Sequence, residues 1–189
     1  MKNTLIILLT ALLPVSSGFG QTAEKTVEKI RAVYTEVSEK AKLAETDDDQ
    51  GEYGDLVMNE LVINKRRHQW RAVGIFNETY KFFYKATGED LYPETLLMVK
   101  VERNVSNRSY AEEYLYNEKG ALLFYFQRAE NDDQVPAERR VYFNLGKPVR
   151  IIEDEKKRDK LTAKDLAAAR DIIMESGKIA AIFKGSVKL

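Results

Sequence analysis

The sequence predicts a single α+β domain, in which an N-terminal helix and a C-terminal helix pack on one twisted antiparallel sheet, a meander of hairpins. Near both ends of the chain, apolar residues recur at steps of three and four, which is the period of an amphipathic helix. The middle of the chain is rich in β-branched and aromatic residues and is divided by turn residues. At ordinary strand length this middle region provides about six or seven strands.

The N-terminal segment, residues 1–20, has the pattern of a secretory signal peptide. Lys2 gives a positive start, residues 5–13 are almost entirely apolar, and Gly18 to Gly20 form a small-x-small exit. The apolar run is too short to span a bilayer, and the sequence that follows it is polar. We therefore expect residues 1–20 to be removed and residues 21–189 to form one exported domain, periplasmic or secreted, with no membrane span.

The composition excludes several kinds of site. The chain has no cysteine and one histidine, so disulfides, cysteine nucleophiles and histidine-rich zinc sites are impossible. Basic and acidic residues balance at 30 each, which gives no overall field that favours nucleic acid. The sequence has no glycine-rich phosphate loop and no nucleophile-elbow motif. We expect no cofactor and no nucleic-acid partner.

The N-terminal helix is predicted over residues 23–45. Val27, Ile30, Tyr34 and Val37 lie on one stripe of such a helix, which is expected to end in the polar stretch that begins at Thr46. Five carboxylates occur in residues 47–55, but they lack the alternating order of a calcium-binding loop. The sequence therefore predicts a solvated loop here and no metal site.

Two sequence segments in the middle region predict hairpins. Residues 114–123 and 141–149 each consist of an aromatic strand, a turn that runs from Asn to Gly, and an apolar strand. Asn and Gly tolerate the positive φ that tight turns require. A looser third copy covers residues 82–92. We expect these copies to be successive hairpins of one meander.

These two hairpin segments resemble a unit found in other bacterial proteins. Residues 114–126 and 140–152 are similar to the Y-x-Y-[DN]-x-x-G-x-L strand-turn-strand units of uncharacterised secreted or periplasmic bacterial proteins. The resemblance implies a hairpin at each position. It implies no site residue and no function.

The C-terminal helix is predicted to begin after Thr162. Thr162 and Asp165 have the spacing of a capping arrangement, and apolar residues follow at helical intervals. Gly177 is expected to end the helix, and residues 179–183 fit either a further helical turn or a late strand. The charged run 153–160 alternates in sign, which indicates a solvated connection or a first helical turn.

One candidate ligand-binding surface is the basic stretch 65–71, which contains the one histidine and the one tryptophan of the chain. On a strand, Lys65, Arg67 and Arg71 would form a cationic row, with Trp70 on the other face as a stacking platform. Such a row suits an acidic glycan or an acidic protein surface. The alternative interpretation is a solvated strand or turn with Trp70 anchored in the core.

A second candidate is a tyrosine-rich face of the sheet that includes Tyr114, Tyr116 and Tyr142. Tyrosine offers a large rigid ring and a hydroxyl group, which together suit ligand binding. The alternative interpretation is that a terminal helix covers these tyrosines.

The sequence favours an exported, non-enzymatic binding or inhibitory module of the cell envelope, whose partner is an envelope protein or an anionic glycan. Its ligand and any catalytic residues are unknown at this stage. The alternative is an envelope hydrolase with paired carboxylates, which requires two acidic groups about 5 to 9 Å apart. No pair of acidic residues stands out in the sequence.

Overall fold

The computed structural model describes residues 18–46, 56–71, 73–85 and 95–187, and it confirms the α+β class. The sheet has nine strands rather than the six or seven expected. The apolar part of the predicted signal peptide, the acidic stretch 47–55 and the turn of the third hairpin copy lie outside the described residues. The elements are α1 (Gly18–Glu45), β1 (Val57–Ile63), β2 (Gln69–Trp70), β3 (Gly74–Lys85), β4 (Thr95–Val105), β5 (Arg108–Tyr116), β6 (Leu122–Glu130), β7 (Glu138–Asn144), β8 (Lys147–Glu153), β9 (Lys156–Arg158) and α2 (Ala163–Ser186).

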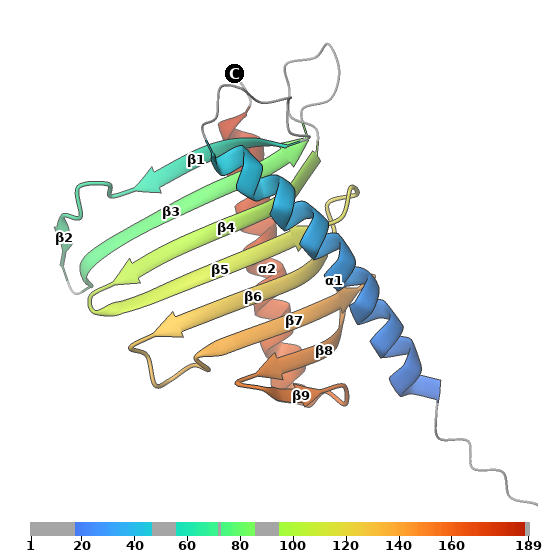
Figure 1. Ribbon diagram of the computed structural model, residues 1–189. Coiled ribbons are helices and arrows are strands. Elements are labelled where there is room, and N and C mark those ends of the chain that lie inside the picture. Colours follow the sequence, from blue (N-terminus) through green and yellow to red (C-terminus); the bar gives the residue numbers. More distant parts are fainter. Residues whose placement is uncertain (1–17, 47–55, 72, 86–94, 188–189) are drawn as a thin grey trace, which may run out of the picture.

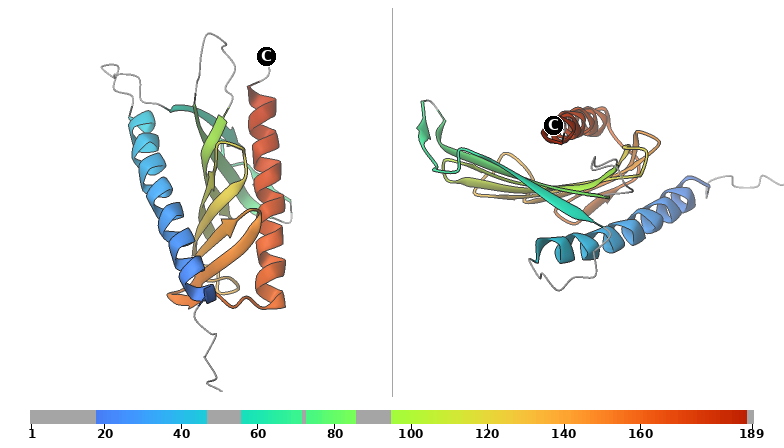
Figure 2. Two further views of the ribbon diagram at one scale, coloured as in Figure 1. Left: turned by 90° about the vertical axis from the view of Figure 1, so that its right-hand side faces the viewer. Right: turned by 90° about the horizontal axis from the view of Figure 1, so that it is seen from above.

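The strands follow one another across the sheet in chain order. β1 pairs with β3, and from β3 to β9 each strand pairs antiparallel with the next, while the short β2 pairs with the start of β3. The two helices cover opposite faces of this sheet (Figure 2). On its face, α1 crosses the strands diagonally and leaves one end of β3 to β6 uncovered (Figure 1).

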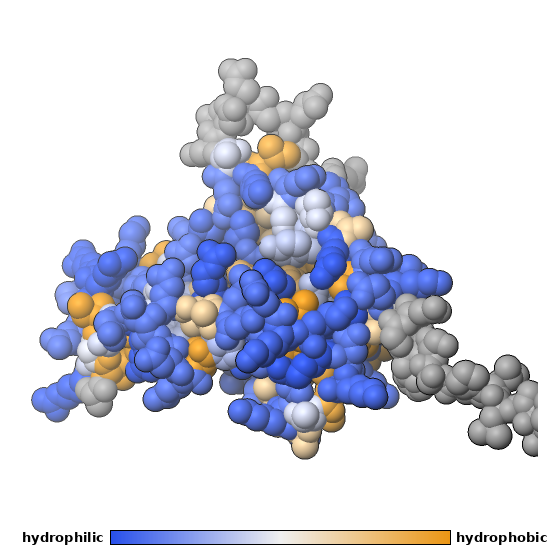
Figure 3. Space-filling model, turned by 60° about the horizontal axis from the view of Figure 1, so that its bottom comes forward, coloured by the Kyte–Doolittle hydropathy of each residue, from blue (hydrophilic) through white to orange (hydrophobic). Residues whose placement is uncertain are grey.

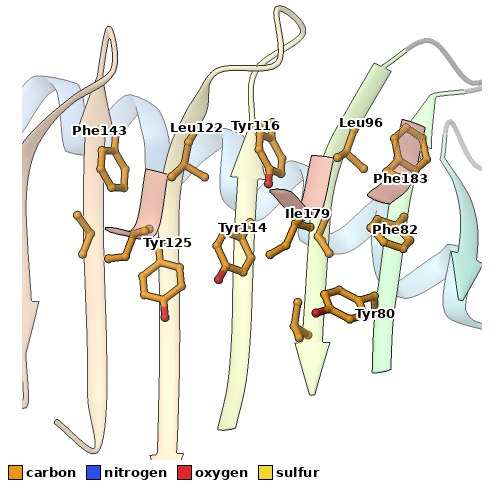
Figure 4. Close-up of a cluster of buried hydrophobic side chains, with 14 of the residues drawn as sticks. Tyr80, Phe82, Leu96, Tyr114, Tyr116, Leu122, Tyr125, Phe143, Ile179 and Phe183 are labelled. Carbon is orange, nitrogen blue, oxygen red and sulfur yellow. The ribbon is translucent and has the colours of Figure 1, made fainter. Parts of the chain in front are cut away.

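Each face of the sheet has its own apolar core, because successive strand residues point to opposite sides. Phe82 is 1% exposed in the core beneath α2, and its neighbour Phe83 is fully buried in the core beneath α1. The α2 core contains Ile179 and Phe183 of the helix and a set of tyrosines from the strands (Figure 4). Residues of α1 in the other core are Val27, Ile30, Val37 and Ala41, the stripe that the sequence predicts.

The first predicted hairpin turn is confirmed. Gly120 has φ +76°, and its N–H donates to the carbonyl of Asn117 at 2.8 Å. The Asn117 side chain also accepts from the backbone N–H of Lys119 and Ala121, so it satisfies donors inside the turn. In the second hairpin the positive φ values fall at Leu145 and Gly146.

The start of α2 is also confirmed, but its predicted end is wrong. Thr162 caps the helix through Asp165 in a reciprocal capping box. Gly177 does not end the helix, which continues to Ser186 and includes residues 179–183. Most of the charged run is exposed, but residues 156–158 form the strand β9, in which Arg158 lies opposite Ile151 of β8 and pairs diagonally with Glu153 at 2.7 Å. Among the described residues, no helix is long and apolar enough to cross a membrane.

Candidate functional site

The basic stretch lies at a tip of the molecule, where the chain passes from β1 through β2 into β3. We call residues 64–71 and 73–76 the tip. The predicted cationic row on a strand is wrong, because only Gln69 and Trp70 are paired as β2. Arg67 lies in the turn before them with φ 54°, so Lys65, Arg67 and Arg71 do not share the face of one strand. All three side chains are nevertheless exposed.

Trp70 is not anchored in the core either. Its side chain is 47% exposed and packs on one side against Phe76, with ring centroids 5.0 Å apart. Val73 and Ile75 on the same tip are 41% and 46% exposed. Figure 3 shows such hydrophobic side chains among hydrophilic ones at the left end of the molecule, where β2 lies in Figure 1. The tip therefore presents apolar and basic groups together.

Asn64 holds the turn of the tip in shape. It has φ 53°, and its side-chain amide donates to the carbonyls of His68 and Phe76 at 2.8 and 2.5 Å. Its side-chain oxygen accepts from the backbone N–H of His68 at 3.0 Å. These bonds fix the backbone that presents the basic side chains. Within the described part of the chain, no carboxylate pairs with the cations of the tip, which are Lys65, Arg66, Arg67 and Arg71.

The tyrosines of the second candidate surface are buried and do not lie on one face. Tyr114 and Tyr116 are each 2% exposed beneath α2, and Tyr116 donates to the carbonyl of Ser176 in that helix at 3.0 Å. Tyr142 is 3% exposed on the opposite face, beneath α1. A terminal helix thus covers the tyrosines on each face, as the alternative interpretation expected.

A buried charged network lies near these tyrosines on the α2 face. Arg103 donates to Glu78 at 2.6 Å and lies 3.7 Å from Glu112. Glu112 also accepts from the hydroxyl of Tyr114 at 2.7 Å. Burial raises the pKa of Glu112, against the opposing effect of Arg103. The network brings two carboxylates around one arginine, but both are less than a tenth exposed.

A groove between α1 and the uncovered part of its sheet face is not predicted by any pattern in the sequence. The cavity has a volume of about 480 Å³ and lies over β5, β6 and β7. Its lining combines apolar rings with three arginines and two carboxylates. The rings are those of Tyr34, Phe124, Phe126 and Tyr142, the charged groups are Arg31, Arg128, Arg140, Glu113 and Glu138, and Ala111 is a small residue among them.

A hydrogen bond between helix and sheet lies in the lining of the groove. The hydroxyl of Tyr34 donates to Glu113 at 2.5 Å, and its ring packs edge-on against Phe124 with centroids 5.1 Å apart. Burial, together with the Glu113 carboxylate, raises the pKa of Tyr34 to about 12, so the phenol keeps its proton at neutral pH. Glu113 therefore has a fixed donor.

No group of three or more acidic or histidine side chains is placed to hold a metal ion within the residues that the structure describes. Comparisons of the chain with protein-family models, with curated proteins and with solved structures found no match.

Proposed function

We propose that the protein is an exported, non-enzymatic binding module of the cell envelope that attaches to an anionic surface through its tip. The half-exposed ring of Trp70, set among cations that have no carboxylate partner in the described structure, is the observation that carries the proposal. A cationic, partly apolar protrusion suits a surface that is negatively charged outside and apolar beneath.

The exposed aliphatic groups favour a layer of anionic lipid headgroups over an acidic glycan or protein. Tryptophan is enriched at membrane interfaces, and Val73 and Ile75 would enter the same layer beside Trp70. A hydrated acidic polymer would contact the cations but would leave these two side chains in water. At about 1 kcal/mol for each basic residue near an anionic surface, four cations contribute about 4 kcal/mol, so the attachment is reversible and sensitive to salt.

The carboxylates of the structure favour binding over hydrolysis. Glu78 and Glu112 are buried around Arg103, out of reach of a large substrate. In the groove, Glu113 accepts a hydrogen bond from the Tyr34 hydroxyl and Glu138 pairs with Arg140. Paired-carboxylate catalysis needs one acid and one base that both reach the substrate, so we prefer the binding module to the hydrolase.

Tryptophan fluorescence offers a direct test, because Trp70 is the only tryptophan in the chain. Residues 21–189 are titrated with vesicles of phosphatidylglycerol and phosphatidylethanolamine, and with vesicles of neutral phosphatidylcholine. We expect a blue shift of the emission with the anionic vesicles alone, which weakens as salt is raised. The variant Lys65→Ser/Arg67→Ser/Arg71→Ser should lose the shift.

A matched control removes three cations elsewhere. Lys164, Arg170 and Lys184 are exposed on α2, and replacing all three with Ser changes the net charge equally. This control should bind anionic vesicles like the unmodified protein. Equal loss in both variants, or binding to alginate with none to vesicles, would overturn the lipid proposal, and the alginate result would assign an acidic glycan instead.

Export has its own test. The protein is recovered from the envelope fraction of its own cells, and its N-terminus is determined. The signal-peptide pattern predicts that the mature chain begins at Gln21. A chain that retains residues 1–20 would contradict the export part of the proposal.

A further inference from the structure

The groove beneath α1 has an unmatched positive charge. Arg128 has no carboxylate partner among the described residues, and Arg31 donates only to the neutral hydroxyl of Tyr142, at 3.4 Å. Arg140 is the third arginine and pairs with Glu138. The hydroxyl of Tyr34 bonds to Glu113 without cancelling its charge, so three arginines and two carboxylates leave the groove with a formal net charge of +1, and two of its guanidinium groups have no carboxylate partner among the described residues.

The aromatic lining holds these arginines in place. The guanidinium carbons of Arg128 and Arg140 lie 5.9 and 5.7 Å from the ring centroid of Phe126, and that of Arg31 lies 5.7 Å from the centroid of Tyr142. A guanidinium group positioned over a ring keeps its N–H groups available and loses less freedom when it binds an oxyanion.

The hollow itself is created by a small residue. Ala111 of β5 lies directly opposite Arg128 of β6 in the sheet, and a methyl group leaves space where its neighbours carry long side chains. The apolar part of the lining includes Phe124 and Phe126. At about 480 Å³ the cavity lies in the usual range for small-molecule sites.

We infer that this groove binds a small molecule in which an oxyanion, a carboxylate, sulfate or phosphate group, is attached to a ring the size of a sugar or a phenyl group. Arg128 and Arg31 bind the oxyanion, and the ring of the ligand lies over the aromatic lining. The site is separate from the tip and does not depend on the proposed attachment to lipid.

The test follows the arginine side-chain N–H signals of residues 21–189 by nuclear magnetic resonance. Phenyl phosphate and benzoate probe an aromatic ring, glucose 6-phosphate and galacturonate probe a sugar ring, and inorganic phosphate and glucose probe each half alone. At least one ring-bearing anion should shift the signals of Arg128 and Arg31 and bind about tenfold more tightly than either half. Tighter binding of phenyl phosphate and benzoate would assign an aromatic ring to the ligand, and tighter binding of glucose 6-phosphate and galacturonate would assign a sugar ring.

Two variants separate a built site from general attraction of anions. Arg128→Gln should weaken binding about tenfold or more, because it removes a charge-assisted pair. Ala111→Leu changes no charge but fills the hollow, and it should weaken binding by a similar factor. Their controls on α2, Arg170→Gln and Ala167→Leu, should bind as the unmodified protein does, since both positions are exposed and outside the groove.

The inference is overturned if no ring-bearing anion shifts the groove arginines at millimolar concentration. It is also overturned if inorganic phosphate binds as tightly as phenyl phosphate, or if Ala111→Leu leaves binding unchanged. The triple tip variant should keep full groove binding, so that failure of the lipid proposal and failure of this one are distinguishable.

Discussion

Arg150 donates to both carboxylate oxygens of Asp159, at 2.6 and 2.8 Å, although its own side chain is only 1% exposed. A further bond of 2.8 Å reaches Glu24 of α1. A buried guanidinium group requires such partners, because an uncompensated charge in the protein interior is costly. One arginine of β8 therefore links the N-terminal helix, the sheet and the segment that leads into α2.

Removal of Asp159 should destabilise the protein more than removal of Arg150. Asp159→Ala leaves a buried arginine that keeps only Glu24, which costs about 3 kcal/mol. Arg150→Met removes the buried charge itself and leaves the carboxylates of Asp159 and Glu24, which are 31% and 41% exposed and can be hydrated, so the cost is about 2 kcal/mol. Urea denaturation measures both losses.

Asp133→Ala is the control for this pair, since Asp133 is exposed and should have little effect. If Arg150→Met proves the more damaging change, then the arginine acts mainly by packing, and the ion pairs are secondary.

The pKa of Tyr34 predicts how stability falls in alkali. An unfolded tyrosine ionises near pH 10, whereas burial and Glu113 raise the pKa of Tyr34 to about 12 in the folded state. The folded protein therefore holds a proton that the unfolded chain releases. This contribution to stability is complete below pH 10 and is lost as the pH rises from 10 to about 12.

Tyr34→Phe should reduce that loss, because phenylalanine does not ionise. The free energy of unfolding is measured in urea at pH 8, 10 and 11, and the difference between pH 8 and 11 is compared for the two proteins. An equal decline in both would show that Tyr34 ionises at its ordinary pKa in the folded state.

Local chemistry made the helices and hairpins predictable from the sequence. The stripe that begins with Val27 and Ile30 needs only its own spacing to be recognised, and the turn from Asn117 to Gly120 needs only residues that tolerate positive φ. The end of α2 is wrongly predicted because glycine adopts both helical and non-helical backbone conformations. Gly177 therefore does not by itself end the helix, which continues through it.

The faces of the strands and the groove depend on cross-strand register, which the sequence alone does not contain. Tyr114 lies opposite Tyr125, which lies opposite Val141, so the next residue, Tyr142, points to the other face. A register shift between Leu115 and Tyr116 skips Leu123 of β6, so Leu122 packs beneath α2 whereas Phe124, two positions on, packs beneath α1. The groove joins α1 to β7, and its contact between Arg31 and Tyr142 spans 111 positions in the chain.

Gly177→Ala should stabilise the protein by about 0.5 to 1 kcal/mol. A glycine inside a helix costs about that much relative to alanine, and a Cβ added at this position meets nothing within 4 Å. The same change at Gly120 also meets nothing within 4 Å, but its φ of +76° disfavours any residue with a Cβ. Gly120→Ala should therefore destabilise by about 1 kcal/mol.

Thermal or urea denaturation of the two variants tests this contrast. Destabilisation by Gly177→Ala would mean that the helix ends at this glycine after all. An unchanged midpoint for Gly120→Ala would mean that the hairpin turn is wrongly assigned.

Trp70→Ala should cost little stability and should remove the attachment to anionic vesicles. The ring is 47% exposed and packs on Phe76. Its removal should therefore lower the free energy of unfolding by about 1 to 2 kcal/mol, less than the loss of a fully buried aromatic residue. The bonds that Asn64 makes to His68 and Phe76 do not involve the ring, so the turn should keep its shape.

Phe143→Ala provides the comparison, because Phe143 is fully buried and its loss should cost about 3 to 5 kcal/mol. Stability is measured in urea and vesicle binding by sedimentation, which does not require a tryptophan. A loss of stability as large as that of Phe143→Ala would place Trp70 in the core. A stable Trp70→Ala protein that still sediments with anionic vesicles would show that the cations act without the ring, whereas a stable protein that no longer sediments places Trp70 in the binding surface.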